Sequence, residues 1–321
     1  MEFRQLKYFL DIVESKGLSR AAEHLHVAQS ALSRQVAELE GELGVKLLLR
    51  SRNGVTTTEA GKVFYEYARG ILKQIADARE AVLRSSDTVV GSVVVALPQS
   101  VAATLALPLM RAAASRYPSV LFHLNEELTG NMADQLLGGR VDMAIFTETM
   151  PSRDIAFVPL VKEAFVLMHA PHDAHAPAAG DISIEEATAR PLVLPSPQHG
   201  HCTRWVVDDA LKLIGHPPQR VAAEINSVYV LKSAVEAGIG PSIMPLGLAQ
   251  REVEEGRLIA HRIVSPDVSR TLGLCTSRHL PETNARRALC KLIKDVVHHL
   301  CESGQWAGAS LVPPDGRGGP G

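Results

Sequence analysis

The stretch from Leu18 to Glu42 constrains the fold more than any other, because its apolar positions predict two short helices joined by a tight turn. Ser19 is expected to cap the first helix with its hydroxyl. The inner side of this helix is formed by Ala21, Ala22 and Leu25. Residues 26–29 interrupt the apolar pattern, so the second helix is expected to begin near Ser30.

The second helix has two chemically different sides. Its inner side is an apolar stripe at helical spacing, formed by Leu32, Val36, Leu39 and Leu43. The opposite side carries Ser30, Ser33, Arg34 and Ala37, with Gln29 at the start of the helix. Arginine pairs twice with guanine, serine donates or accepts, glutamine reads adenine, and alanine tolerates the thymine methyl. The pattern predicts a helix-turn-helix recognition helix, although any small three-helix domain contains a similar pair of helices.

A basic hairpin is predicted directly after this helix. Residues 47–49 form a short strand, Asn53 and Gly54 form the turn, and Val55 begins the returning strand. The net charge of the whole chain is −2, so any contact with nucleic acid must come from a local basic patch. Arg50 and Arg52 supply that patch as a wing against phosphates or the minor groove. The alternative interpretation is an ordinary solvated basic turn.

A long helix is predicted from about Glu59 to Ser85, roughly 40 Å at 1.5 Å per residue. Thr58 is its expected cap, although Thr56 with Glu59 also fits a capping box. Its apolar residues form a heptad seam of Phe64, Ala68, Ile71, Ile75, Ala78 and Val82. We expect this seam to pair with a second subunit, and packing against its own chain is the alternative.

The composition is that of a globular protein with two or three domains: 321 residues, of which 46% are hydrophobic. We find neither a signal peptide nor an apolar run of transmembrane length, so a cytoplasmic protein without membrane contact is expected. The four cysteines lie far apart, which favours reduced thiols.

From Gly91 onward, strands and helices alternate, and the first of them form a βαβαβ run that predicts a parallel sheet. A second series follows, so we expect an α/β fold of two lobes, lobe I about 91–161 and 267–302 and lobe II about 162–266. Pro159–Lys162 and Ser265–Val268 are the expected crossings between the lobes. Gly and Pro dominate residues 303–321, which predicts a disordered tail.

Ligands of such sheets lie at the carboxyl ends of the strands, near helix N-termini. The residues expected to bind a small effector between the lobes are Gln99, Ser100, Thr129, Thr147, Ser196, Cys202 and Ser227. Hydroxyls and free backbone N–H groups suit a small anion, and Arg204 is the only guanidinium expected nearby. Taken singly, each of these hydroxyls also fits an ordinary helix cap.

The chain resembles the LysR-type transcriptional regulators from Phe3 to about Leu300. The resemblance is carried by LSRAAEHL after Gly17, by SALSRQV and LEGELG, and by TTTEAG before the long helix. FRQLKYF and GVTTTEAGK are most similar to the nitrogen assimilation control regulators.

This resemblance implies three parts: a winged helix-turn-helix on residues 1–58, a linker helix on 59–88, and a two-lobed periplasmic-binding-protein-like effector domain on 89–302. It also implies homodimers or homotetramers that bind promoter DNA at T–N11–A sites, work with RNA polymerase, and activate or repress in response to a small effector. By position, Gln29, Ser30, Ser33 and Arg34 are expected at bases, and Ser19, Arg50 and Arg52 elsewhere on the DNA.

Other functional classes have less support in the sequence. The motifs GxGxxG after a strand, GxSxG, HExxH and the P-loop are all missing, so neither an enzyme nor a resident cofactor is expected. His169, His172 and His175 invite a metal-site interpretation, which we do not favour. Cys202 as a redox sensor and the whole chain as a solute-binding protein remain the two alternatives.

Overall fold

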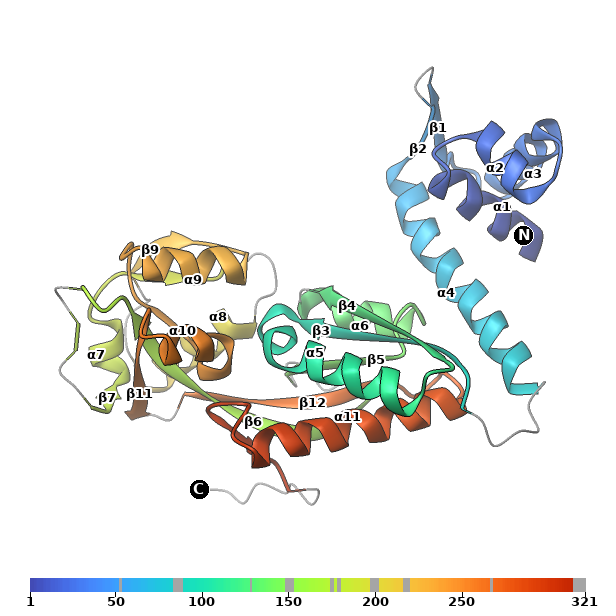
Figure 1. Cartoon of the computed structure of the whole chain (residues 1–321). Helices are drawn as coiled ribbons and strands as arrows, with labels where there is room; N and C mark the ends of the chain where they lie inside the picture. The colour runs from blue at the N-terminus through green and yellow to red at the C-terminus, as the bar shows by residue number, and fades with distance from the viewer. Residues whose placement is uncertain are drawn as a thin grey trace. The chain divides into compact units, whose positions relative to one another are not determined.

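The computed structural model describes residues 1–51, 54–82, 89–127, 129–147, 153–173, 176–177, 180–196, 202–215, 220–265 and 268–313. At residues 80–82, 129, 202 and 265 it describes the backbone alone. The chain forms two compact units (Figure 1): the N-terminal unit comprises Met1–Asp87, and the C-terminal unit comprises nearly all the remaining residues.

Three helices, a hairpin and a long helix make up the N-terminal unit. In chain order they are α1 (Phe3–Glu14), α2 (Leu18–Leu25), α3 (Gln29–Leu43), β1 (Leu48–Ser51), β2 (Gly54–Thr57) and α4 (Glu59–Val82). Its core contains Phe9, Ile12, Leu32 and Leu39, all fully buried. Phe9 meets Phe64 of α4 edge to face, with 5.2 Å between the ring centroids.

Two local expectations for α2 and α3 are wrong. Helix α2 begins at Leu18 with Gly17 at its cap position, so Ser19 lies inside the helix and its hydroxyl caps nothing. Leu43 belongs to the last turn of α3 and is 39% exposed, because the helix ends at Gly44 in a left-handed conformation with φ +69°. The other three members of the apolar stripe, Leu32, Val36 and Leu39, are fully buried as predicted.

The predicted hairpin is present, but β1 begins one residue and ends two residues later than expected, and β2 begins at Gly54, which was expected in the turn. β1 and β2 pair antiparallel, with Arg50 opposite Val55 and Ser51 opposite Gly54. Arg52 and Asn53 lie outside the described residues. Gly54 has φ +121°, and a Cβ here would lie 2.6 Å from the carbonyl oxygen of Lys16, so only glycine fits.

Helix α4 is capped by Thr58, as the sequence predicts: the Thr58 hydroxyl accepts a hydrogen bond from the Gly61 N–H at 2.9 Å. The predicted seam is divided along the helix. Ala68 is fully buried and Phe64 packs in the core of its own unit, so for these two positions the expectation of a partner subunit is wrong. Ile71 remains 38% exposed.

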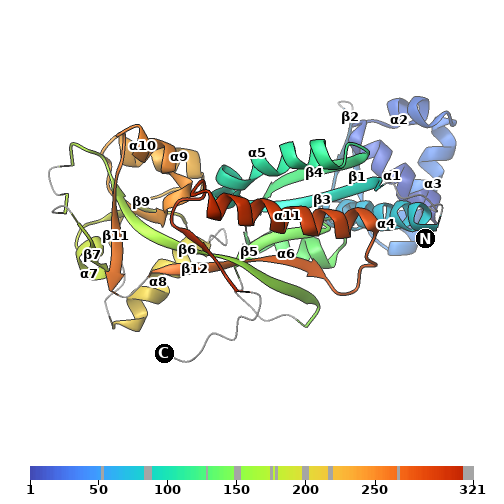
Figure 2. The ribbon, with the colours of Figure 1, turned by 60° about the horizontal axis from the view of Figure 1, so that its bottom comes forward.

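Lobe I of the C-terminal unit contains β3 (Gly91–Pro98), α5 (Gln99–Arg116), β4 (Val120–Glu127), α6 (Thr129–Leu137), β5 (Met143–Thr147), β12 (Ser269–Ser277) and α11 (Asn284–Glu302). Strand β3 pairs parallel with β4 and β5, which confirms the βαβαβ prediction. Helices α5 and α11 cover one face of the sheet and α6 covers the other (Figure 2).

Lobe II contains β7 (Ile182–Ser183), α7 (Ile184–Thr188), β8 (Leu192–Leu194), α8 (Cys202–Leu213), β9 (Val221–Glu224), α9 (Val228–Glu236), β10 (Ser242–Pro245), η2 (Leu246–Leu248), α10 (Gln250–Glu254) and β11 (Ile259–Ser265). Strand β6 (Ile155–His169) runs through both lobes (Figure 2). It pairs with β12 up to Ala164 and with β10 and β11 from Phe165 onward. The crossing predicted at Pro159–Lys162 is therefore wrong, because those residues still belong to the lobe I sheet.

The prediction of a disordered tail from residue 303 is wrong for residues 303–313. Trp306 is 1% exposed, and β13 (Ala309–Leu311) pairs antiparallel with Val161–Glu163 of β6. The burial of Trp306 and the pairing of β13 with β6 both hold this segment in place, and its Gly and Pro content reveals neither of them. Residues 314–321 lie outside the described part of the chain. Within the described part, no helix combines the length and the apolar character that a membrane crossing requires.

Candidate DNA-binding surface

The outward side of α3 is polar, whereas its buried side consists of Leu32, Val36 and Leu39 together with the Glu40 side chain. Gln29, Ser30, Arg34 and Ala37 are exposed, and Ser33 is half-buried. Because the inner residues fix the rotation of the helix against α1 and α2, the polar side is held outward by the core itself. Each side chain predicted to contact bases therefore lies on the accessible side of the helix.

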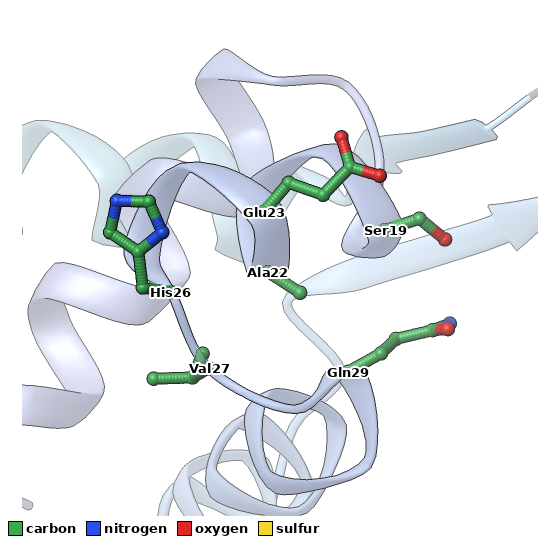
Figure 3. Close-up of a pocket in the computed structure, with 6 residues that line it drawn as sticks. All are labelled: Ser19, Ala22, Glu23, His26, Val27 and Gln29. Carbon is green, nitrogen blue, oxygen red and sulfur yellow. The ribbon is translucent and has the colours of Figure 1, made fainter.

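An open hollow between α2 and α3 brings together Ser19 and Gln29, both of which are predicted to contact DNA (Figure 3). It is lined by Ser19, Ala22, Glu23, His26, Val27 and Gln29. Ser19 of α2 and Gln29 of α3 point their polar ends to the same side in this view. His26 makes the tight turn possible by adopting a left-handed conformation with φ +54°. Ser19 thus belongs to the same surface as the recognition helix, although it does not cap α2.

The wing is tied to the recognition helix by a hydrogen bond that the sequence does not reveal. Arg50 Nη1 of β1 donates to Ser33 Oγ at 2.9 Å. Because Ser33 accepts from Arg50, its own hydroxyl proton remains for donation to an acceptor outside the protein. Arg50 and Ser33 therefore form one polar element, and not two independent contacts.

Arg34 is held by an acidic neighbour one turn further along α3. Its Nε donates to Glu38 Oε1 at 2.8 Å, and this hydrogen bond raises the pKa of the Arg34 guanidinium above its ordinary value. Gln35 Nε2 donates to the other oxygen of the same carboxylate at 2.8 Å. The side chain of Arg34 is 79% exposed, so the pair lies at the surface.

Glu40 is a buried carboxylate on α3 that the sequence pattern does not single out. Its side chain is buried, Oε1 accepts from the backbone N–H groups of Leu47 at 2.9 Å and Leu48 at 3.1 Å, and Oε2 accepts from Lys46 at 2.7 Å. Burial raises the pKa of Glu40, but the hydrogen bonds from Lys46, Leu47 and Leu48 outweigh it and hold that pKa below the ordinary value. Glu40 thereby fixes the start of the wing to the recognition helix.

The residues predicted to bind an effector lie in different environments. Gln99 and Ser227 lie at the junction of the lobes: Gln99 Oε1 accepts from the Val228 N–H at 3.2 Å, and the Ser227 hydroxyl caps α9 by accepting from Val230 at 3.4 Å. Ser196 is 9% exposed, and the Thr147 hydroxyl is buried without a hydrogen-bond partner among the described residues. The side chains of Thr129 and Cys202 are outside the described part.

Ser100 is part of a buried ionic cluster that corrects the expectation of a single nearby guanidinium. Arg270 Nη2 donates to Ser100 Oγ at 2.8 Å and pairs with Glu163 at 2.6 Å, and the side chain of Arg270 is fully buried. Trp306 Nε1 donates to the other oxygen of Glu163 at 2.8 Å. Arg204 is itself paired with Asp208 and Glu224, so neither guanidinium is free for an anion.

The fold does not support a metal site at the histidine motif. His169 is buried at the end of β6, where its Nε2 lies 3.0 Å from Nε2 of His261. The two rings stack with 5.1 Å between their centroids. Among the described residues, no group of three potential ligands is placed to hold a metal. His175 falls outside these residues.

Three of the four cysteines are thiols and not disulfides, as expected: Cys275, Cys290 and Cys301. Burial raises the pKa of Cys301 to about 11, and the nearby Glu163 carboxylate adds to the effect. At neutral pH this thiol is therefore protonated and unreactive.

Two family models match the chain. Residues 3–62 match "Bacterial regulatory helix-turn-helix protein, lysR family", and residues 86–297 match "LysR substrate binding domain". The chain belongs to the LysR family of transcriptional regulators. As a LysR regulator it carries a DNA-binding helix-turn-helix and an effector-binding domain, so the solute-binding alternative is set aside.

Relatives of this LysR regulator match it over nearly its full length. The nitrogen assimilation regulatory protein nac of Escherichia coli is 32% identical over 308 residues, which cover 95% of this chain and 99% of that protein. A crystal structure of full-length CbnR in complex with its target DNA has 25% identity and TM-score 0.65, covering 93% of this chain and 99% of CbnR. A full-length OxyR variant of Pseudomonas aeruginosa has 24% identity and TM-score 0.70, covering 98% and 99% of the two chains, and shows the shared fold.

Proposed function

We propose that this LysR regulator reads promoter DNA by inserting α3 into the major groove. In this proposal Gln29, Ser30, Ser33 and Arg34 contact base edges, and Ser19, Arg50 and Arg52 contact the sugar–phosphate backbone or the adjacent minor groove. The observation that carries the proposal is the outward polar side of α3, with the wing residue Arg50 bonded to Ser33 at 2.9 Å.

The oligomeric state belongs to the same proposal. Helix α4 exposes three large side chains, Val63, Tyr67 and Ile71, of which Tyr67 is 56% exposed. Pairing of this surface with a second copy buries it and brings two recognition helices to one site, as a homodimer or as a homotetramer of two such dimers.

The binding experiment uses fluorescence anisotropy with a duplex containing a T–N11–A site and a shuffled duplex of the same composition, at about 150 mM salt. We expect binding to the site to be at least about 1,000-fold tighter than to the shuffled duplex. The same comparison is made for each promoter fragment of the genome and its shuffled counterpart. If every promoter fragment binds no more tightly than its shuffled counterpart, the proposal is overturned.

For the C-terminal unit, we infer a small polar effector between the lobes. The Thr147 hydroxyl, which is buried and has no hydrogen-bond partner within the described part of the chain, supports this together with the N-terminus of α9 at Ser227. Because Arg204 and Arg270 are both paired with carboxylates, a neutral polar molecule fits better than the anion expected from the sequence. A rise in the unfolding temperature with a library of neutral metabolites, abolished by Thr147→Val, tests this.

The physiological setting is inferred from similarity to nac of Escherichia coli. We propose a cytoplasmic regulator, without enzymatic activity, that controls nitrogen assimilation genes together with RNA polymerase. A genome-wide map of bound sites tests the pathway, since sites confined to unrelated genes would contradict it.

A further inference from the structure

Glu38 is an acidic residue on a surface that is proposed to face a polyanion. Its two carboxylate oxygens are used separately: Oε1 accepts from Arg34 Nε and Oε2 accepts from Gln35 Nε2, both at 2.8 Å. An unpaired carboxylate here would repel the DNA phosphates. Each oxygen of this carboxylate therefore has a partner, and both partners, Arg34 and Gln35, belong to α3.

The hydrogen bond from Arg34 Nε to Glu38 leaves the two Nη atoms of the guanidinium available for another acceptor. Arginine carries five N–H groups in a fixed planar fork, and Glu38 occupies only the one on Nε. The two Nη atoms remain as the parallel pair of donors that matches O6 and N7 of guanine. Because a long exposed side chain loses rotamer freedom on binding, a guanidinium already fixed in the free protein loses less.

We propose that Glu38 is a positioning residue that fixes Arg34 for one guanine and thereby determines specificity at that base pair. The inference rests on the proposed insertion of α3 into the major groove. The expected signature is unusual, because the carboxylate also repels the duplex. Its removal should strengthen binding to all sequences while it weakens the distinction between them.

The experiment compares Glu38→Ala and Glu38→Gln with the wild type on a specific duplex and on copies in which each guanine–cytosine pair is replaced in turn. Arg34→Ala first identifies the pair that Arg34 reads. At that pair we expect Glu38→Ala to lower the discrimination ratio about two- to fivefold, the range of an exposed ion pair, with no change at other pairs. Glu38→Gln keeps one acceptor without the charge, so it should retain part of the ratio while it shares the gain in general affinity.

Two controls make the result specific. Glu42→Gln removes the same charge from an exposed position of the same helix, where the carboxylate contacts only the N-terminal ammonium among the described residues, and it should leave the ratio unchanged. In the Arg34→Ala background, Glu38→Ala should have no further effect on the ratio, because Glu38 acts through Arg34. Circular dichroism melts check that all variants fold.

The outcomes separate this inference from the proposed function. If the wild type has no base preference, the proposed function fails. If Arg34→Ala identifies a guanine and Glu38→Ala leaves its ratio intact, the positioning role is overturned and the DNA-reading surface stands. A loss of discrimination at every base pair, or the same loss in Glu42→Gln, also overturns the positioning role.

Discussion

At the scale of single residues, hydrogen bonds between side chains of the N-terminal unit decide which donors remain for DNA. Arg50 uses the oxygen of Ser33, so Ser33 is left as a donor. Glu38 uses the Nε of Arg34, so the Nη atoms of Arg34 are left as donors. If α3 enters the major groove as proposed, this face offers donors to N7 and O6, the acceptors on the major-groove edge of guanine.

Arg34→Ala tests this donor face directly. If Arg34 pairs with guanine, the variant should lose about 1–3 kcal/mol of binding free energy on the specific duplex and relax the preference at one base pair. Anisotropy titrations on duplexes with single-pair replacements measure both quantities. An equal loss on every duplex would instead identify Arg34 as a phosphate contact.

Glu40→Gln should destabilise the N-terminal unit in a pH-dependent way. The pKa of Glu40 in the folded chain lies below its ordinary value of 4.5, so the carboxylate stabilises the fold fully above about pH 4.5. This stabilisation is lost as the pH falls through the lower pKa of the folded state. Urea unfolding should give a difference of about 1–3 kcal/mol between wild type and variant at pH 7, shrinking below pH 4.5. A difference that grows on acidification would contradict the ionic role.

At the scale of elements, α4 is buried on one side near its start and exposes large side chains elsewhere. Its first turns pack in the core of the N-terminal unit through Phe64 and Ala68, and Tyr67 and Ile71 are exposed, which leaves them available for the subunit pairing proposed above. A heptad pattern records only that one side of a helix is apolar, and it does not record which neighbour covers it. For this reason the heptad pattern does not predict that Phe64 and Ala68 are covered by their own unit.

Ile71→Asp should therefore break the pairing of subunits without unfolding the N-terminal unit. Sedimentation equilibrium is expected to show a lower oligomer, since a carboxylate in an apolar helix seam is left buried and unpaired. Ala76→Asp, an exposed position on another side of α4, is the matched control and should leave the mass unchanged. An unaltered mass for Ile71→Asp would remove α4 from the interface.

Local patterns predicted most elements, whereas contacts between distant residues escaped prediction. The apolar stripe of α3, the Thr58 cap and the βαβαβ order follow from residues within a few positions of one another. Glu40 with Leu47, and Glu163 with Arg270, depend on how separate elements are placed, which a single sequence does not specify. The tail was misjudged for the same reason, because the site that buries Trp306 is built by other elements.

At the scale of the whole C-terminal unit, residues 303–313 join both lobes. Trp306 donates to Glu163 at the crossing, and the Ala307 N–H donates to Gln250 Oε1 of lobe II at 3.3 Å. Trp306→Phe keeps most of the packing and removes the donor, so it should cost about 1–3 kcal/mol of unfolding free energy by urea titration. Ser310→Ala, at an exposed position of β13, is the control and should stay within about 0.5 kcal/mol. Equal effects of the two substitutions would contradict a specific role for Trp306.

The proposed binding of one promoter by two recognition helices can be tested by changing the spacing between the halves of the DNA site. If two recognition helices bind one promoter together, the halves of the T–N11–A site must lie on a common face of the duplex. Inserting five base pairs between them turns one half by about half a helical turn and should weaken binding about 100-fold, because simultaneous contact is lost. Inserting ten base pairs returns the two halves to the same face of the duplex and should recover part of the affinity. Anisotropy with the three duplexes measures this, and Ile71→Asp should bind all three with the same weak affinity. A wild type that is indifferent to the insertions would mean that each subunit binds DNA independently, whatever its oligomeric state in solution.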